Sequence, residues 1–315
     1  MSEEPIENSK VLGPPKNLAA GLVKAIRPRQ WVKNVLVLAA PLAAGQLRFD
    51  NAEVWRNAGV AFVAFCLAAS AIYLINDALD VEADRNHPTK RYRPIAAGVV
   101  PIGLAYVLAV VLAAASVGVA LLANWQTAVV IAIYLAIQLA YCLGLKHQAV
   151  VDICIVSSGF LLRAIAGGAA TGIDLSKWFL LVMAFGSLFM AAGKRYAELQ
   201  LAEQTGAKIR KSLEYYTTGY LRFVWTLSAT AVVLCYGLWA FDPHVDRAGN
   251  DVDNVFYAVS MVPFTVAILR YAVDVDGGAA GEPEEIALGD RVLQVLALAW
   301  IVCVGVAVYV YPSWS

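Results

Sequence analysis

Four polar side chains in the stretch 76–84 could bind a metal ion together. This stretch reads Asn76-Asp77-Ala-Leu-Asp80-Val-Glu-Ala-Asp84 and follows a long apolar run. On a helix, spacings of three, four and seven residues place the four polar side chains on one face. Three carboxylates at a membrane boundary repel one another unless a cation neutralises them, and Mg²⁺ prefers oxygen ligands. We therefore predict a magnesium site here, with Asp77, Asp80 and Asp84 as its catalytic groups and Asn76 as a fourth ligand.

Basic side chains follow these carboxylates directly, in the segment 80–99. In proteins Mg²⁺ is usually bound by one or two carboxylates together with substrate phosphates, and Arg and Lys neutralise the remaining phosphate oxygens. Arg85, Lys90, Arg91 and Arg93 are therefore candidates for contacts with a polyphosphate. The alternative is that they are ordinary topology determinants beside a membrane helix. The sequence leaves both interpretations open.

Two further groups of residues lie near or inside apolar runs. Tyr141 and Lys146 end one run, and Arg163 lies well inside the next. An arginine at that depth is costly and normally faces the interior of a helix bundle with a partner, so we interpret Arg163 as functional or internally paired. The basic and aromatic segment 27–34 is interpreted equally well as a phosphate site or as an interfacial anchor.

The elements that must position these residues are transmembrane helices. The chain has 315 residues, of which 60% are hydrophobic and 15% charged, and its mean hydropathy is +0.64. These values exclude an ordinary soluble globule and indicate an all-α, polytopic membrane bundle. Because the formal net charge is zero, total charge says nothing about partners, and the information lies in how charge is distributed.

About nine spans are expected from the length that a helix needs to cross a bilayer. The first is short and contains Pro41, so a helix on the membrane surface is its alternative. The excess of Lys and Arg in alternate connections predicts a cytoplasmic amino terminus and places the carboxylates on the cytoplasmic face. The expected spans are 32–47, 55–79, 100–123, 125–145, 150–171, 176–193, 218–241, 254–273 and 290–311.

The remaining segments complete the expected organisation. Residues 1–23 are expected to form a flexible cytoplasmic segment, and residues 24–315 a single transmembrane catalytic domain. Its long cytoplasmic loops would be 80–99, 193–217 and 274–290. The last is acidic, and we leave open whether it is a solvated loop or a lid over the site.

These motifs resemble those of the UbiA superfamily of intramembrane prenyltransferases. The resemblance rests on the acidic pattern from Asn76 to Asp84, on Arg27-Pro28-x-x-x-x-Lys33-Asn34 and on the element from Tyr141 to Lys146, and it covers residues 24–311. More narrowly, the runs Gly193-Lys-Arg-Tyr-Ala-Glu-Leu-Gln200 and Arg270-Tyr-Ala-Val-Asp-Val-Asp-Gly-Gly278 resemble actinobacterial decaprenyl-phosphate phosphoribosyltransferases. Ordinary superfamily members have a second aspartate-rich motif after the sixth span. Here that position holds Lys194, Arg195 and Glu198.

The resemblance implies a Mg²⁺-dependent transfer of the 5-phosphoribosyl group from phosphoribosyl diphosphate to decaprenyl phosphate, for arabinan cell-wall precursor synthesis. The enzyme would lie in the plasma (inner) membrane with its active site facing the cytoplasm, and we expect no nucleic-acid partner. Whether it forms a homo-oligomer stays open. The alternatives are a prenyltransferase acting on an aromatic acceptor and, less favoured, a metal-ion transporter. The residues implied for the donor phosphates are Arg85, Lys90, Tyr141, Lys146, Arg163, Lys194, Arg195 and Glu198, and those for the lipid phosphate are Arg29, Lys33 and Asn34.

Overall fold

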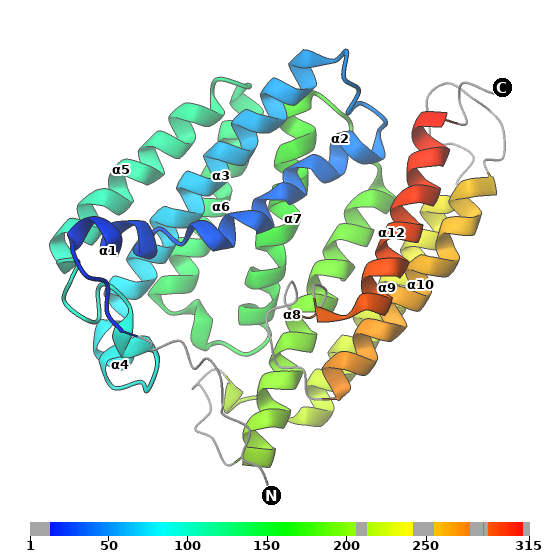
Figure 1. Cartoon of the computed structure of the whole chain (residues 1–315). Helices are drawn as coiled ribbons and strands as arrows, with labels where there is room; N and C mark the ends of the chain where they lie inside the picture. The colour runs from blue at the N-terminus through cyan, green and yellow to red at the C-terminus, as the bar shows by residue number, and fades with distance from the viewer. Residues whose placement is uncertain (1–12, 206–212, 242–254, 278–285, 287–288, 311–315) are drawn as a thin grey trace, which may run out of the picture.

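The fold is all-helical, as expected. The structure, a computed structural model, describes residues 13–205, 213–241, 255–277, 286 and 289–310, and these contain helices and no strand. Eight helices are long and apolar enough to cross a membrane, and each coincides with one of the expected spans (Figure 1). Their bounds are α3 Ala52–Leu79, α5 Ile102–Ala120, α6 Trp125–Leu143, α7 Val151–Thr171, α8 Lys177–Thr205, α9 Thr218–Ala240, α10 Val255–Asp276 and α12 Arg291–Gly305, which a π-turn extends over Val306–Val310.

The expected first span, 32–47, is not a single α-helix. It consists of the 3₁₀ helix η1 (Pro28–Leu38) and the short helix α2 (Ala39–Ala43), which contains Pro41. At ~2.0 Å per residue for a 3₁₀ helix and ~1.5 Å for an α-helix, the two pieces together approach the ~30 Å of a bilayer core. The segment runs beside α3, where the indole of Trp31 donates to Ser70 Oγ at 3.2 Å.

Two expected boundaries were wrong because helices continue through them. The loop expected at 193–217 begins later, since α8 continues to Thr205. Residues 194–204 contain no proline or glycine and are rich in helix-forming Lys, Glu, Gln, Leu and Ala, and Tyr196 in this part is fully buried. The expected flexible segment 1–23 contains the start of helix α1 (Leu18–Ala25), which Asn17 caps by accepting from the Ala20 amide at 2.9 Å.

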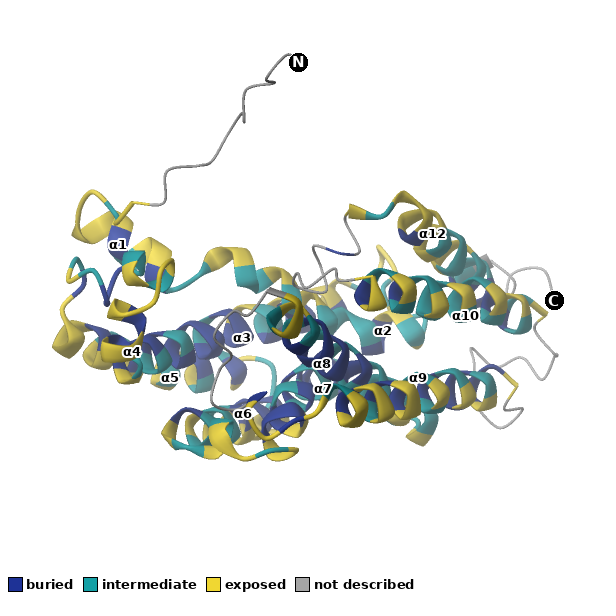
Figure 2. Cartoon of the chain, turned by 90° about the horizontal axis from the view of Figure 1, so that it is seen from below, coloured by how far each residue is buried: buried dark blue, intermediate teal, exposed yellow. Residues whose placement is uncertain are grey.

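The buried core follows two groups of helices that meet at α7 and α8. Helices α3 and α7 are the most buried of the long helices, with 61% and 56% of their apolar stretch buried, against 33% or less in the other six. Figure 2 shows this as dark-blue interior ribbons surrounded by yellow outer faces. One core contains Phe65, Ile131 and Val37, and another contains Phe189, Tyr196 and Trp225. The interior is therefore built around α3, α7, α8 and the η1 segment, to which α6 and α9 contribute one face each.

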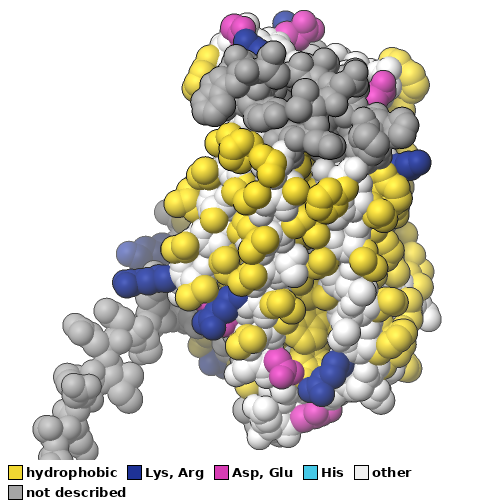
Figure 3. All heavy atoms as spheres, turned by 90° about the vertical axis from the view of Figure 1, so that its right-hand side faces the viewer, with side chains coloured by type: hydrophobic (Ala, Val, Ile, Leu, Met, Phe, Trp, Pro, Cys, Tyr) yellow, Lys and Arg dark blue, Asp and Glu magenta, His cyan; other side chains and the backbone are white. Residues whose placement is uncertain are grey.

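The outer surface of the bundle is apolar, as a lipid-facing surface should be. Exposed large hydrophobic side chains include Val110, Leu122, Val262 and Val295. On the side of the molecule where α10 and α12 lie, hydrophobic side chains dominate the middle, and most acidic side chains gather toward the two ends (Figure 3). This distribution agrees with the expected multi-pass arrangement in a membrane.

Candidate active site

Two of the predicted carboxylates converge where α3 meets the short helix α4 (Val81–Arg85). Asp77 is 2% exposed and Asp84 is 3% exposed. Arg93 Nη1 lies 3.2 Å from Asp77 Oδ1 and 2.7 Å from Asp84 Oδ2, so one cationic nitrogen bridges both side chains. Arg27 closes the site from the other side, with Nη2 2.6 and 2.8 Å from the two Asp77 oxygens. Arginine side chains thus neutralise both buried carboxylates.

The third carboxylate, Asp80, points to a different cation. Asp80 is the residue at which α3 ends, and α4 begins at the next residue. Its Oδ1 lies 2.5 Å from Lys146 Nζ, which belongs to the 3₁₀ turn η3 (Leu145–His147) between α6 and α7. Asp80 thus pairs with a different cation from Asp77 and Asp84, although the hydrogen bonds from the Asp80 amide to the Asn76 carbonyl and from the Asp84 amide to the Asp80 carbonyl continue the helical pattern through this turn.

The donor set nevertheless fits a hard divalent cation. Among the described residues no three acidic, histidine or cysteine side chains lie close enough together to form a complete metal site. Asp77 and Asp84 do share one cation position, now filled by Arg93. Mg²⁺ typically takes one or two carboxylates and completes its shell with water and substrate phosphates, which such a pair could support. Asn76 is half-buried at the end of α3.

Arg195 and Glu198 of α8 form a second charged cluster with Asp152, which we call the Arg195 cluster. Arg195 is 7% exposed, and its Nη1 lies 3.1 Å from Glu198 Oε2. Its Nε lies 3.4 Å from Asp152 Oδ2, in the first turn of α7. The guanidinium is therefore balanced by two carboxylates of the protein, and half-buried Lys194 precedes it on the same helix.

Arg163 and Asn34 contact each other at a distance from the carboxylates Asp77 and Asp84. Arg163 Nε donates to Asn34 Oδ1 at 2.7 Å and Nη1 donates to the Gly159 carbonyl at 2.6 Å. Asn34, fully buried, donates in turn to Cys66 Sγ at 3.2 Å. Cys66 precedes Asp77 by three helical turns, or ~16 Å along α3. The structure therefore shows Arg163 as internally paired and does not bring it or Asn34 to the predicted phosphate sites.

The remaining predicted phosphate ligands lie on α4, η2, η1 and α6. Arg85 is exposed and pairs with Glu82 at 2.7 Å, while Lys90 is half-buried in the 3₁₀ turn η2 (Lys90–Tyr92). On η1, Arg29 is exposed and Lys33 is half-buried. Tyr141, half-buried, lies in the last turn of α6, just before the Lys146 turn.

The structure pairs Arg27 and Arg93 with carboxylates, whereas the sequence offered them as parts of basic segments that could contact phosphate. Arg27 and Arg93 bind the buried carboxylates, and both precede a proline. That shared Arg-Pro pattern is a signal in the sequence, since proline favours an irregular backbone just before it. Asp152, fully buried, and Tyr216, which donates a hydrogen bond to it, follow no such pattern.

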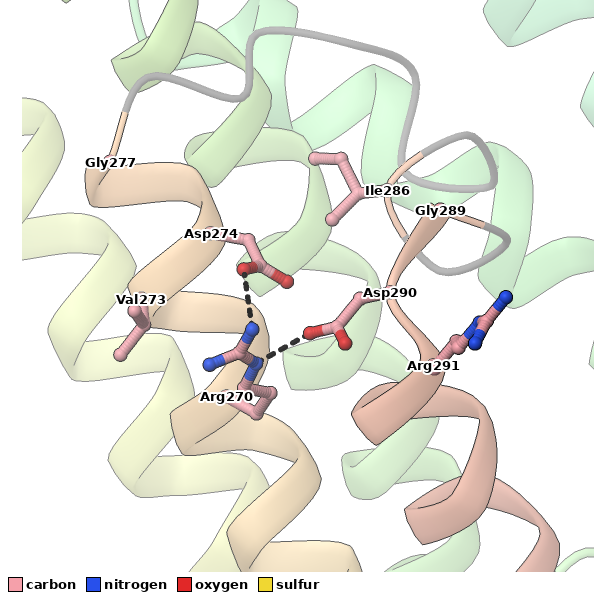
Figure 4. Close-up of a pocket in the computed structure, with 8 residues that line it drawn as sticks. All are labelled: Arg270, Val273, Asp274, Gly277, Ile286, Gly289, Asp290 and Arg291. Atoms are coloured by element: carbon pink, nitrogen blue, oxygen red, sulfur yellow. Dashed lines mark hydrogen bonds and ion pairs between the residues drawn. The ribbon is translucent and has the colours of Figure 1, made fainter.

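A cavity of about 580 Å³ lies at the ends of α10 and α12, and none of the predicted ligands lines it. Figure 4 shows Arg270 between Asp274 and Asp290, with Nε 2.5 Å from Asp290 Oδ2 and Nη2 3.6 Å from Asp274 Oδ1. The hydrogen bond that Arg270 donates to Asp290 lowers the pKa of the Asp290 carboxyl. The remaining lining residues are Val273, Gly277, Ile286, Gly289 and Arg291. Most of the acidic segment predicted at 274–290 falls outside the described residues, so the choice between loop and lid is not tested.

Comparison with known proteins identifies close relatives of nearly full length. The chain is 69% identical over 317 residues to the decaprenyl-phosphate phosphoribosyltransferase of Mycolicibacterium smegmatis, covering 98% of each chain. It is 71% identical over 300 residues to the enzyme of the same name from Mycobacterium tuberculosis, covering 95% of this chain and 97% of the relative. The corresponding enzyme of Corynebacterium glutamicum is 63% identical over 311 residues, with 98% and 92% covered.

Solved structures share the fold at much lower identity. A UbiA homologue from Archaeoglobus fulgidus bound to GPP and Mg²⁺ matches with a TM-score of 0.68 and 14% identity, over 92% of this chain and 100% of that one. A digeranylgeranylglyceryl phosphate synthase structure matches with a TM-score of 0.62 and 15% identity, over 91% and 98%. The model of the UbiA prenyltransferase family matches residues 35–277. With its motifs, its helical bundle and this match in agreement, the chain belongs to the UbiA prenyltransferase family.

Proposed function

We propose that this protein transfers the 5-phosphoribosyl group of phosphoribosyl diphosphate to decaprenyl phosphate and releases diphosphate, supplying arabinan cell-wall precursor synthesis. The observation that carries the proposal is 69% identity, over 98% of both chains, to a relative named for decaprenyl-phosphate phosphoribosyl transfer. The charge of the site supports it, because Lys194 and Arg195 stand where the resemblance implies an acidic motif in ordinary superfamily members. A donor with a diphosphate and a separate monophosphate needs more cationic partners than a prenyl diphosphate does.

Mg²⁺ is the cofactor that we assign to the carboxylate end. Asp77 and Asp84 would hold it, with Asp80 and Asn76 as the remaining protein ligands. Bound there, the ion would neutralise the diphosphate and stabilise its departure. The convergence of Asp77 and Asp84 on a single cation supports this assignment.

The cations now paired with these carboxylates are suited to the diphosphate itself. Arg27 and Arg93 are only about a quarter exposed, with side-chain values of 26% and 27%, so each is partly buried yet reachable. If a metal ion took over the charge of Asp77 and Asp84, both guanidiniums would become available to phosphate oxygens, which they bind in a bidentate manner. Lys146, beside Asp80, would hold a further donor oxygen.

The transfer itself needs alignment more than proton chemistry. The bond between ribose C1 and the diphosphate oxygen breaks, and a bond from C1 to an oxygen of the lipid phosphate forms. Because the lipid phosphate is already ionised at neutral pH, no general base is required. C1 develops oxocarbenium character as in other glycosyl transfers, so catalysis rests on holding donor and acceptor in line.

Acceptor binding and membrane placement complete the proposal. Arg29 and Lys33 lie on η1, which leads from the carboxylate end along α3, and would bind the lipid phosphate while the polyprenyl tail lies among the helices. The excess of Lys and Arg supports a plasma-membrane enzyme whose carboxylate end faces the cytoplasm.

A comparison of donors tests the proposal. The purified protein, reconstituted in lipid vesicles, is incubated with decaprenyl phosphate and radiolabelled phosphoribosyl diphosphate, or with a labelled prenyl diphosphate and an aromatic acceptor. The proposal predicts that label is transferred to decaprenyl phosphate in the first incubation and that no prenylated aromatic product forms in the second. A prenylated aromatic product with the second pair alone would assign the other family activity instead.

A further inference from the structure

Val150, just before α7, has a backbone conformation that its side chain disfavours. Its φ is +71° and its ψ is −49°. Among the described residues the only other non-glycine position with positive φ is Arg27. A β-branched side chain rarely adopts positive φ, because Cβ then crowds the backbone. Surrounding contacts must therefore hold Val150 in place.

The hydroxyl of Tyr216, just before α9, provides that contact. The Val150 amide donates to Tyr216 Oη at 2.5 Å, and Tyr216 Oη donates to the buried carboxylate of Asp152. Burial of the phenol raises the pKa of Tyr216 well above its usual range, so the hydroxyl remains a proton donor at physiological pH. Asp152 is anchored in turn by Arg195 on α8.

The turn that Val150 closes is the one that carries Lys146. The chain leaves α6 at Gly144, whose φ of +154° suits a glycine, and forms the 3₁₀ turn that contains Lys146. The turn rejoins α7 through a bond from the Asp152 amide to the Gln148 carbonyl at 3.0 Å. Lys146 reaches Asp80 from this turn, at 2.5 Å. The conformation at Val150 thus fixes where the Lys146 backbone lies.

We propose that Tyr216 is a positioning residue, which holds the strained Val150 turn so that Lys146 meets Asp80 and the donor phosphates. This inference rests on the proposed function, since it concerns binding of phosphoribosyl diphosphate at the same site. Tyr216 itself touches no reacting atom. Its hydroxyl links Asp152, which belongs to the Arg195 cluster, to the Val150 amide beside the Lys146 turn.

Replacing Tyr216 by phenylalanine tests this role, because it removes the hydroxyl and keeps the buried ring. In this variant the Val150 amide has lost its acceptor, so Val150 leaves its positive φ and the turn relaxes. We expect the KM for phosphoribosyl diphosphate to rise between about 10- and 100-fold, as misplaced binding groups cause. Tyr220→Phe is the matched control, because its ring stacks on Tyr216 at 5.9 Å and the described contacts give its hydroxyl no role; it should behave like the wild type.

Two double variants separate positioning from general destabilisation. In a Lys146→Met background, Tyr216→Phe should raise the KM no further, because the hydroxyl acts through the lysine. Val150→Gly should restore most of the lost affinity in the Tyr216→Phe variant, since glycine adopts positive φ without strain. An equal KM increase in both lysine backgrounds, or no rescue by Val150→Gly, would overturn the proposal. If Tyr216→Phe alone fails to fold, the proposal requires the double variant with Val150→Gly to fold and bind the donor.

Hydrogen–deuterium exchange tests the positioning without any turnover. The amides of residues 145–148 should exchange faster in Tyr216→Phe than in the wild type, and Val150→Gly should slow them again. Unchanged exchange in this segment would refute the role of Tyr216 even in an active enzyme. Conversely, if the wild type does not use phosphoribosyl diphosphate, the proposed function fails while the exchange result still decides the positioning.

Discussion

The Asp77→Asn substitution should separate the charge of the buried carboxylate from its shape. Asp77 is 2% exposed and is contacted by Arg27 at 2.6 and 2.8 Å and by Arg93 at 3.2 Å. Asparagine keeps the volume but removes the charge, and leaves two cations facing a neutral amide. Charge-assisted hydrogen bonds contribute about 1.5–3 kcal/mol each when buried, and both arginines are partly solvated, so we expect a loss of stability of about 2–3 kcal/mol.

The loss of activity should be much larger than the loss of stability suggests. If Asp77 holds the ion that stabilises the departing diphosphate, its neutralisation should lower kcat by about 10²- to 10³-fold, the usual effect of removing one electrostatic stabiliser. The assay is release of diphosphate from phosphoribosyl diphosphate in vesicles that contain the folded protein and decaprenyl phosphate, with thermal unfolding measured on the same sample.

Glu82→Gln is the matched control for this experiment. Glu82 lies in the same segment, but it is exposed and pairs with Arg85 at the surface, where an ion pair contributes about 0–1 kcal/mol. Its neutralisation should leave kcat within a factor of about two of the wild type. Near-normal kcat in a folded Asp77→Asn variant, or equal losses in both variants, would refute the metal-site assignment.

Three other outcomes follow from the same geometry. Lys146→Met should raise the KM for phosphoribosyl diphosphate about tenfold, because it removes a cation beside Asp80; an unchanged KM in initial-rate assays would exclude donor binding by this lysine. Gly167→Ala should prevent stable folding, because the added Cβ would lie 1.9 Å from the Val37 carbonyl oxygen. Its control is Gly103→Ala, where the added Cβ would meet no atom within 4 Å, and this variant should leave thermal unfolding unchanged. Chelation of divalent cations should abolish diphosphate release and added Mg²⁺ should restore it, while full activity in excess chelator would contradict the assigned cofactor.

The sequence was sufficient to predict the long helices, because their boundaries depend on local chemistry. Each of the eight long helices is a run of apolar residues, and several begin at a capping side chain such as Asn51, Asn124 or Asp290. Where the sequence misled, hydropathy was a poor guide: α8 continues beyond its apolar run because a charged, helix-forming segment packs Tyr196 against Trp225. The first span differs because a 3₁₀ geometry is not visible in a pattern of apolar residues.

The residues of the site could be predicted from the sequence only where their chemical type and spacing identify them. The aspartates are recognisable from their spacing, but which cation each carboxylate meets depends on helix ends and turns far apart in the chain. The pairing of Lys146 with Asp80 illustrates this, since 66 residues separate the two. Arg163 shows the opposite case: its depth in α7 correctly indicated an internal partner, and only the fold identifies that partner as Asn34.

A doubly labelled donor tests the central claim most directly. Phosphoribosyl diphosphate carrying ¹⁴C in the ribose and ³²P in the diphosphate is given to the protein in vesicles that contain decaprenyl phosphate. The account predicts ¹⁴C in the lipid fraction, an equal amount of ³²P released as diphosphate, and neither with Asp77→Asn. Retention of both labels in the donor by folded wild-type protein supplied with Mg²⁺, or ³²P entering the lipid with the ribose, would contradict it.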